Sequence, residues 1–129
     1  MIKLLVVADD FTGGLDTGVQ FAGHGIDTLV CACEPGNPVP AFPDGVEVLV
    51  IDSETRHVRP ADAYRHVLGI VRAVGAPHVY KKTDSTLRGN VGAELQAVLD
   101  ATGAEELVFV PALPKTGRTT VGGVQFVNG

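Results

Sequence analysis

The segment Lys81–Asn90 (KKTDSTLRGN) combines two lysines, an aspartate, an arginine and several hydroxyl groups between a β-branched apolar run and a helical pattern. Arg88 could hold a carboxylate through two parallel hydrogen bonds, and a lysine nearby would add a compact positive charge. Asp84 and Ser85 offer an acceptor and a donor suited to hydroxyl groups, while Gly89 leaves room at the start of the next helix. This clustering predicts a site for a small anionic ligand with hydroxyl groups. The alternative is a solvated turn with an Asp84–Arg88 ion pair.

A second polar turn, Ala8–Asp16 (ADDFTGGLD), follows the first apolar run of the chain. Asp9 and Asp10 are adjacent, so on an extended chain one can face the site while the other caps the next helix or holds backbone donors. A carboxylate there could take a proton from a substrate hydroxyl, hydrogen-bond sugar hydroxyls or help to hold a metal ion. The alternative is helix capping with favourable charge at the helix N-terminus. The Gly-Gly pair lets the backbone approach a ligand, and a helix N-terminus favours an anion.

Two more charged segments follow later apolar runs. Arg56 and His57 could each reach a shared site, or form a surface pair ahead of a helix. The segment Pro111–Thr120 (PALPKTGRTT) contains Lys115 and Arg118. Its Lys-Thr-Gly-Arg order does not match the phosphate-binding loop that places Lys-Ser/Thr after two spaced glycines. No G-x-G-x-x-G follows the first apolar run either, so no dinucleotide fingerprint is present.

The apolar patterns predict alternating strands and helices. Strands are expected at residues 2–8, 26–33, 46–51, from 78 to 80, and at 107–110. Helices are expected from an N-cap at Thr12 to residues 23–25, from 60 to 75, and from 91 to 103. Residues 34–45 contain four prolines and are expected to form a loop. This order predicts an α/β fold with an open, mostly parallel sheet and helices on both faces, a Rossmann-like three-layer arrangement.

The carboxyl ends of parallel strands lie at one edge of the sheet, where α/β proteins bind ligands. The turns after the first, third, fourth and fifth predicted strands should therefore converge on one crevice. Only one of the adjacent residues Lys81 and Lys82 can face that crevice.

Composition limits the classes of partner. The 129 residues suffice for about one domain, and the net charge of −5 argues against general binding to nucleic acid or to an anionic membrane. No apolar run approaches the roughly 20 residues of a membrane span. Cys31 and Cys33 are expected to be buried thiols of a cytoplasmic protein. The pair Asn128-Gly129 is a hairpin signal with no strand after it, which predicts that the chain is the front part of a longer protein.

At these motifs the sequence resembles the four-carbon acid sugar kinases, and specifically their N-terminal domain. Three stretches carry the resemblance in the same order: ADDFTGGLDTGVQFA, KKTDSTLRGNVGAEL and PALPKTGRTTVGGVQFVNG. The central stretch is the most specific. One departure is Gly14, where a small residue such as alanine is expected, and this changes no chemistry.

The resemblance implies an enzyme that transfers the γ-phosphoryl group of ATP to a hydroxyl of threonate, erythronate or a 3-oxo-tetronate. It implies a sugar-acid-binding N-terminal domain (residues 1–129) and a C-terminal domain that supplies most of the nucleotide site. Mg²⁺ is expected with ATP, and no metal ligand is assigned to this chain. Assembly into a homo-oligomer is left open. By the family pattern the substrate side comprises Asp9, Asp10, Lys82, Asp84, Ser85, Arg88 and Arg118. Asp10 and then Asp84 are the candidates for the catalytic base.

Two other functions compete with this interpretation. An aspartyl phosphatase also carries aspartates after its first strand, but that chemistry needs two aspartates separated by one residue, whereas Asp9 and Asp10 are adjacent. A non-catalytic module that senses a sugar acid would show saturable binding of the acid with no ATP turnover, even in the complete gene product. For the kinase, the chain alone is expected to bind substrate weakly, if at all, and not to turn over, because domain closure would complete the site.

Overall fold

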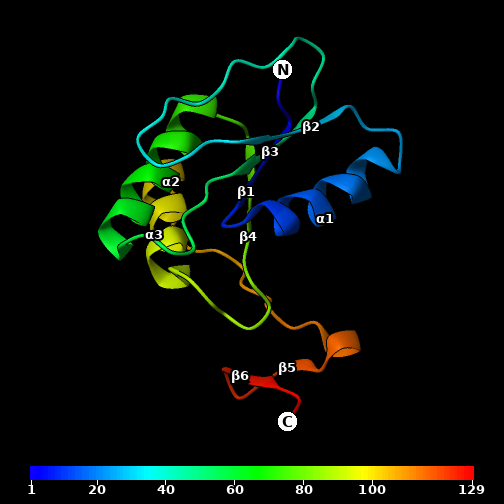
Figure 1. Cartoon of the computed structure of the whole chain (residues 1–129), viewed down its shortest axis with the longest axis vertical. Helices are drawn as coiled ribbons and strands as arrows, with labels where there is room; N and C mark the ends of the chain where they lie inside the picture. The colour runs from blue at the N-terminus through cyan, green and yellow to red at the C-terminus, as the bar shows by residue number, and fades with distance from the viewer.

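The structure, a computed structural model, describes all 129 residues. Four parallel strands form one sheet in the order β2-β3-β1-β4 (Figure 1). They are β1 (Leu4–Ala8), β2 (Thr28–Ala32), β3 (Val48–Asp52) and β4 (His78–Lys82). Ala8 at the end of β1 pairs with Asp52 on one side and Lys82 on the other. The loops after β1, β3 and β4 therefore start from one edge of the sheet.

Helices cover both faces of this sheet, as the sequence predicts. The helices are α1 (Phe11–Ala22), α2 (Pro60–Val74) and α3 (Val91–Thr102). Figure 1 shows α1 on one face and the pair α2 and α3 on the other. The expected three-layer α/β arrangement is confirmed.

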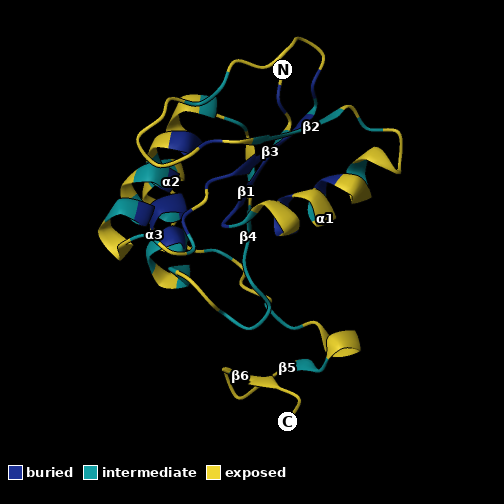
Figure 2. Cartoon of the chain, viewed as in Figure 1, coloured by how far each residue is buried: buried dark blue, intermediate teal, exposed yellow.

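Strict alternation along the central strand β1 explains why both faces are covered. Leu5 and Val7 belong to the larger core cluster, which includes Ile70 of α2, whereas Val6 belongs to a smaller cluster that packs against Phe21 of α1. Apolar side chains on both faces of a strand leave no face for solvent. All residues of β3, and all of β1 except Leu4, are accordingly buried (Figure 2).

The helix ends follow local capping rules, with one correction. The N-cap of α1 is Asp10 and not Thr12, because the Asp10 carboxylate accepts a hydrogen bond from Gly13 N at 3.1 Å. Gly75 and Gly103 end α2 and α3 in the left-handed conformation, with φ of 60° and 70°. Gly25 also has a positive φ of 77°, but it lies beyond the C-cap of α1.

The prediction of a fifth strand at residues 107–110 is wrong, because the structure has no strand there. The segment forms no ladder, and Val108 is 91% exposed. β4 therefore remains the edge of the sheet. The β-branched composition favours a strand, but a strand forms only where a neighbour accepts its hydrogen bonds.

The C-terminal residues form a separate small unit. A short 3₁₀ helix (Pro114–Thr116) precedes an antiparallel hairpin of β5 (Arg118–Val121) and β6 (Val124–Val127). The hairpin turn is at Gly122-Gly123, both with positive φ, and not at the Asn128-Gly129 pair. None of the helices is both long and apolar enough to cross a membrane.

Candidate functional site

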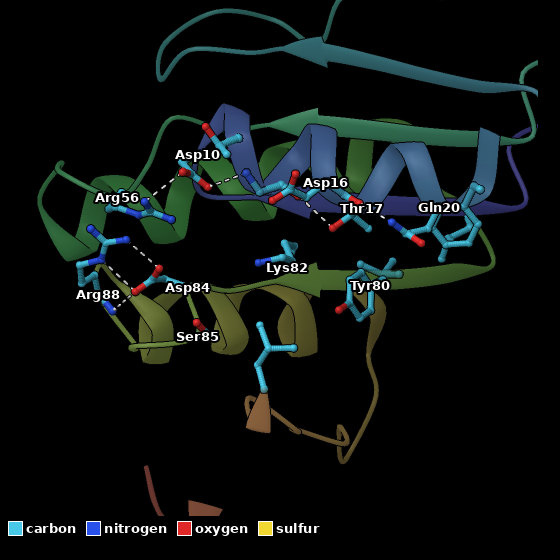
Figure 3. Close-up of a pocket in the computed structure, with 16 residues that line it drawn as sticks. Asp10, Asp16, Thr17, Gln20, Arg56, Tyr80, Lys82, Asp84, Ser85 and Arg88 are labelled. Carbon is cyan, nitrogen blue, oxygen red and sulfur yellow. Dashed lines mark hydrogen bonds and ion pairs between the residues drawn. The ribbon is translucent and has the colours of Figure 1, made fainter. Parts of the chain in front are cut away.

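A cavity of about 810 Å³ lies between α1, β4 and the loops that follow β3 and β4. We refer to it as the polar groove. Its polar lining residues are Asp10, Thr12, Asp16, Thr17, Gln20, Arg56, Tyr80, Lys82, Asp84, Ser85 and Arg88. Figure 3 shows α1 on one side of the groove and β4 on the other, with the two arginines and Asp84 gathered at the end nearest the strand termini.

Arg56, in the loop after β3, is held by both carboxylates that follow β1. Its Nε and Nη2 donate to the two oxygens of Asp9 at 2.9 and 3.1 Å, and its Nη1 donates to Asp10 Oδ2 at 3.0 Å. The hydrogen bonds to Asp9 raise the pKa of Arg56 above its usual value, although burial opposes this. Asp9 is buried and serves mainly this ion pair, whereas Asp10 also lines the groove. The expected division between a facing carboxylate and a supporting one thus holds, with Asp10 also acting as the helix cap.

Asp84 is the centre of the loop after β4. Arg88 donates to both of its oxygens through Nε and Nη2, each at 2.9 Å. The backbone N–H groups of Thr86 and Arg88 and the Thr86 hydroxyl donate to Oδ2 as well. The Arg88 bonds are the main reason that the pKa of Asp84 is held well below its usual range. A carboxylate so fully hydrogen-bonded is a weak proton acceptor.

Lys82 differs from the other two cations of the groove because it has no ion-pair partner. Its Nζ donates to Thr83 O at 2.7 Å and keeps capacity for further acceptors. A Cβ added to Gly13 would lie 3.5 Å from this Nζ, so the first turn of α1 approaches the ammonium group closely. The backbone N–H groups of Phe11 and Thr12 have no acceptor in the chain. An ammonium group beside a free helix N-terminus favours an anion.

Lys81 points to the other face of β4, as the alternation of a strand requires. Its Nζ lies 2.7 Å from Glu94 Oε2 of α3, and both side chains are nearly fully buried. The prediction that only one of the two adjacent lysines faces the site is therefore confirmed.

Backbone geometry brings the two loops of the groove together. Gly89 has a φ of 91°, and a Cβ there would lie 3.1 Å from Asp9 Oδ2 and 3.3 Å from Arg56 Cγ. Asn90 Nδ2 donates to Thr55 O and to a second carbonyl of the β3–α2 loop at 2.8 and 2.9 Å. Leu87 also has a positive φ, of 59°, which is costly for a residue with a side chain. Hydrogen bonds from Asn90 thus hold the loop after β4 against the loop after β3, and the backbone of Leu87 keeps a strained conformation there.

Asp52, at the end of β3, is a buried acid behind the groove. Its Oδ1 accepts a hydrogen bond from Glu54 N at 2.9 Å, while its Oδ2 is buried without a partner. Burial raises the pKa of Asp52 above its usual value. The neighbouring Ser53 hydroxyl donates to Ala8 O at 2.7 Å and so connects the ends of β3 and β1.

The structure brings together most of the residues named from the sequence. Those that line the groove are Asp10, Arg56, Lys82, Asp84, Ser85 and Arg88. Asp9 and Gly89 lie directly behind them, against Arg56. Arg118 is not among the lining residues: it lies on β5, where its Nη1 donates to Thr116 O and its Nε is buried without a partner.

Sequence reasoning missed one wall of the groove. Thr17, Gln20 and Tyr80 line it, as does Asp16, and none of these four was among the predicted site residues. A periodic signal was present, because Gly13, Thr17 and Gln20 recur at helical spacing on one face of α1. On β4, Tyr80 and Lys82 are two apart and share a face.

Comparison with known proteins agrees with this architecture. Residues 4–129 match the family described as the sugar-binding N-terminal domain. A D-threonate kinase of Salmonella typhimurium is 42% identical, and a D-erythronate kinase of Heliobacterium modesticaldum is 39% identical, each over 99% of this chain. A 3-oxo-tetronate kinase of Escherichia coli is 35% identical over 98% of this chain. The chain spans 30%, 30% and 34% of the lengths of these curated relatives.

Solved structures share the fold as well. A Bordetella bronchiseptica protein described as having a domain of unknown function, determined with bound citrate as a domain-swapped dimer, has a TM-score of 0.83 at 38% identity. That match covers 97% of this chain and 32% of the other. A Haemophilus influenzae protein has a TM-score of 0.76 at 30% identity and covers 95% of this chain and 31% of the other.

Proposed function

This chain belongs to the family of sugar-binding N-terminal domains that begin four-carbon acid sugar kinases, and from that premise we propose that its polar groove binds the sugar acid. The substrate class is a four-carbon acid of the threonate, erythronate or 3-oxo-tetronate type. The full enzyme transfers the γ-phosphoryl group of ATP to a hydroxyl of that acid. We place the enzyme in the cytoplasm, where ATP is available.

The observation that carries the proposal is the unpaired ammonium group of Lys82 beside the N-terminus of α1. Arg56 and Arg88 are already neutralised by Asp9, Asp10 and Asp84. A substrate carboxylate would therefore gain most from Lys82 and the adjacent backbone N–H groups. The arginines then act chiefly by fixing the carboxylates that face the substrate hydroxyls.

We assign the catalytic base to Asp10 in preference to Asp84. A base must accept a proton within hydrogen-bond reach of the substrate hydroxyl. Each Asp10 oxygen accepts one hydrogen bond, from Gly13 N and from Arg56 Nη1, and the carboxylate is partly open to the groove. Asp84 holds its loop and is the weaker acceptor. Ser85 remains a donor or acceptor for a second hydroxyl.

The nucleotide would be bound mainly by the C-terminal domain of the same protein. No group of three or more His, Cys, Asp or Glu residues in this chain could hold a metal ion. Mg²⁺ is expected to arrive with the phosphates of ATP. The bound citrate of the Bordetella relative supports the choice of a hydroxy acid as ligand.

The test is a titration of the ¹⁵N-labelled chain with D-threonate, followed by amide chemical shifts in the loops after β1 and β4. We expect Lys82→Met to raise the dissociation constant at least about tenfold, or about 1.4 kcal/mol. Lys3→Met is the matched control, because Lys3 pairs with Glu47 near the opposite end of the sheet. The neutral polyol threitol should bind more weakly than threonate to the unmodified chain, and Lys82→Met should reduce this difference in affinity between the two ligands.

Unchanged threonate affinity in Lys82→Met would remove the ammonium group from the site. ATP consumption by the full-length protein, screened against D-threonate, D-erythronate and 3-oxo-tetronate, tests the kinase assignment separately. Saturable threonate binding without any ATP consumption by the full-length protein would favour the non-catalytic binding module.

A further inference from the structure

Lys81 lies on the face of β4 opposite to the groove, yet it contacts the backbone of the residue that faces the groove. Its Nζ donates a hydrogen bond to Lys82 O at 2.8 Å and pairs with Glu94 Oε2 of α3 at 2.7 Å. Lys82 is the last residue of β4, and its own Nζ donates to Thr83 O at 2.7 Å. The ammonium groups of two adjacent lysines thus hold two consecutive carbonyl groups from opposite faces of the strand.

Packing of β4 against α3 does not by itself call for a buried ion pair. The side chains of Lys81 and Glu94 are only 3% and 2% exposed, so both charges lose most of their hydration, and Glu94 Oε1 has no hydrogen-bond partner. Apolar side chains of similar volume often replace such a pair without loss of stability. An apolar pair cannot supply a hydrogen-bond donor at Lys82 O. This donor is therefore the specific contribution of Lys81.

We propose that Lys81 is a positioning residue for the ammonium group of Lys82, with Glu94 keeping Lys81 in place. This role rests on the proposed function, in which Lys82 binds the carboxylate of the sugar acid. The bond from Lys81 fixes the orientation of the Lys82 carbonyl group, and hence of the peptide unit that leads to Thr83. Because Lys82 Nζ donates to Thr83 O, the placement of that oxygen decides where the ammonium group lies beside α1 (Figure 3). A group held in place beforehand loses less freedom when the ligand binds.

The first turn of α3 supports both loops that border the groove. Glu94 acts on the end of β4 through Lys81, and Asn90, the N-cap residue, donates to Thr55 O and Val58 O after β3. Asn90 makes no side-chain hydrogen bond to its own helix, although the N-cap position favours one. Polar groups at the start of α3 are thus directed at the backbone behind the groove, as expected of residues that position others.

The variant that separates positioning from stability combines Lys81→Met with Glu94→Leu and so removes both charges. In the ¹³C,¹⁵N-labelled 129-residue chain, we expect the carbonyl ¹³C resonance of Lys82 to shift, because that oxygen loses a hydrogen bond. The dissociation constant for D-threonate should rise at least about threefold, as for one lost hydrogen bond. The constant for threitol, which has no carboxylate, should change less. Lys3→Met with Glu47→Leu removes an ion pair near the opposite end of the sheet and should change neither measurement.

The outcomes separate this role from the proposed function. Parental threonate affinity in the charge-free variant, together with weakened binding by Lys82→Met, would overturn the positioning role and leave the proposed function standing. Unchanged binding by Lys82→Met would overturn both. An unshifted Lys82 carbonyl resonance, or an equal rise of the two dissociation constants, would also overturn the positioning role. If the charge-free variant does not fold, Lys81→Met with Glu94→Met serves the same measurements, because methionine adapts to irregular spaces.

Discussion

Single side chains in the groove divide into those that face the ligand and those that hold the facing ones. Arg88 was predicted to grip the substrate carboxylate, but two of its N–H groups are engaged by Asp84, and its guanidinium is largely exposed. Asp9 similarly serves Arg56. Most charged side chains of this groove therefore hold other side chains in position. The residue type alone does not reveal whether a side chain faces the ligand or holds one that does.

The role of Arg88 can be measured through Asp84. Because hydrogen bonds from Arg88 are the main cause of the lowered Asp84 pKa, Arg88→Ala should raise the pKa of Asp84 toward that of an ordinary carboxyl group. The affinity for D-threonate should fall by about 2 kcal/mol as the loop loses its support. Carboxyl ¹³C chemical shifts followed against pH report the first change, and Arg65→Ala on α2 is the control. An unaltered Asp84 titration would show that the loop holds this carboxylate without Arg88.

A second residue, Asp52, makes the stability depend on pH. Its pKa is raised by burial, so the folded chain retains this proton to higher pH than the unfolded chain does. The associated stability is present below the ordinary Asp pKa of about 3.9 and is lost as pH rises through the folded value. Asp52→Asn cannot ionise and should unfold at higher urea concentration than the parent at pH 7, with a difference that shrinks as the pH falls to the ordinary Asp pKa of about 3.9. Asp44→Asn, in an exposed loop, should show no such trend, and a constant difference for Asp52→Asn would contradict the raised pKa.

At the scale of elements, α1 is fitted closely to the sheet through its glycines, and two of them give opposite predictions. A Cβ on Gly14 would lie 3.6 Å from Ala8 Cβ and Val50 Cγ1, an ordinary contact, whereas one on Gly18 would lie 2.7 Å from Val30 Cγ2. Gly14→Ala should stabilise the chain by about 0.5–1 kcal/mol through lower backbone entropy of the unfolded state. Gly18→Ala should destabilise it, because the helix must move off β2. Urea unfolding of both variants checks the pair, and a stabilising Gly18→Ala would show that α1 is packed more loosely than described.

The ion pair between Lys81 and Glu94 joins β4 to α3 inside the apolar layer. Both side chains are almost fully buried, and Glu94 Oε1 has no partner. Lys81→Met alone should destabilise the chain by about 3–5 kcal/mol, because it leaves a buried carboxylate without its cation. Adding Glu94→Leu should recover most of that loss, since the desolvation cost of both charges is then removed. If the double variant is no more stable than Lys81→Met, the pair contributes through packing and not through charge.

Sequence patterns predicted a helix or strand well where neighbouring residues determine it, and less well where it depends on contacts with distant parts of the chain. Neighbouring residues in the sequence predict the strands β1 and β3 and the left-handed glycines that end α2 and α3. The alternation of strands and helices predicts the parallel sheet. Residues 107–110 carry an equally clear strand pattern, but their pairing depends on a distant edge. The convergence of the loops after β1, β3 and β4 was predictable from the parallel topology, whereas the pairing of Arg56 with Asp9 and Asp10 depends on side-chain reach across two loops.

For the whole molecule, the openness of the groove predicts what the isolated chain can and cannot do. The site is built on one domain, and the chain spans about a third of the length of its kinase relatives. Phosphoryl transfer requires that water be excluded and that the nucleotide be positioned, which domain closure provides in enzymes of this kind. We therefore expect the 129-residue chain to bind D-threonate and to consume no ATP above background in a coupled assay. The full-length Salmonella typhimurium D-threonate kinase is the positive control. Threonate-dependent ATP consumption by the short chain, abolished by Asp10→Asn, would mean that this domain holds the nucleotide as well.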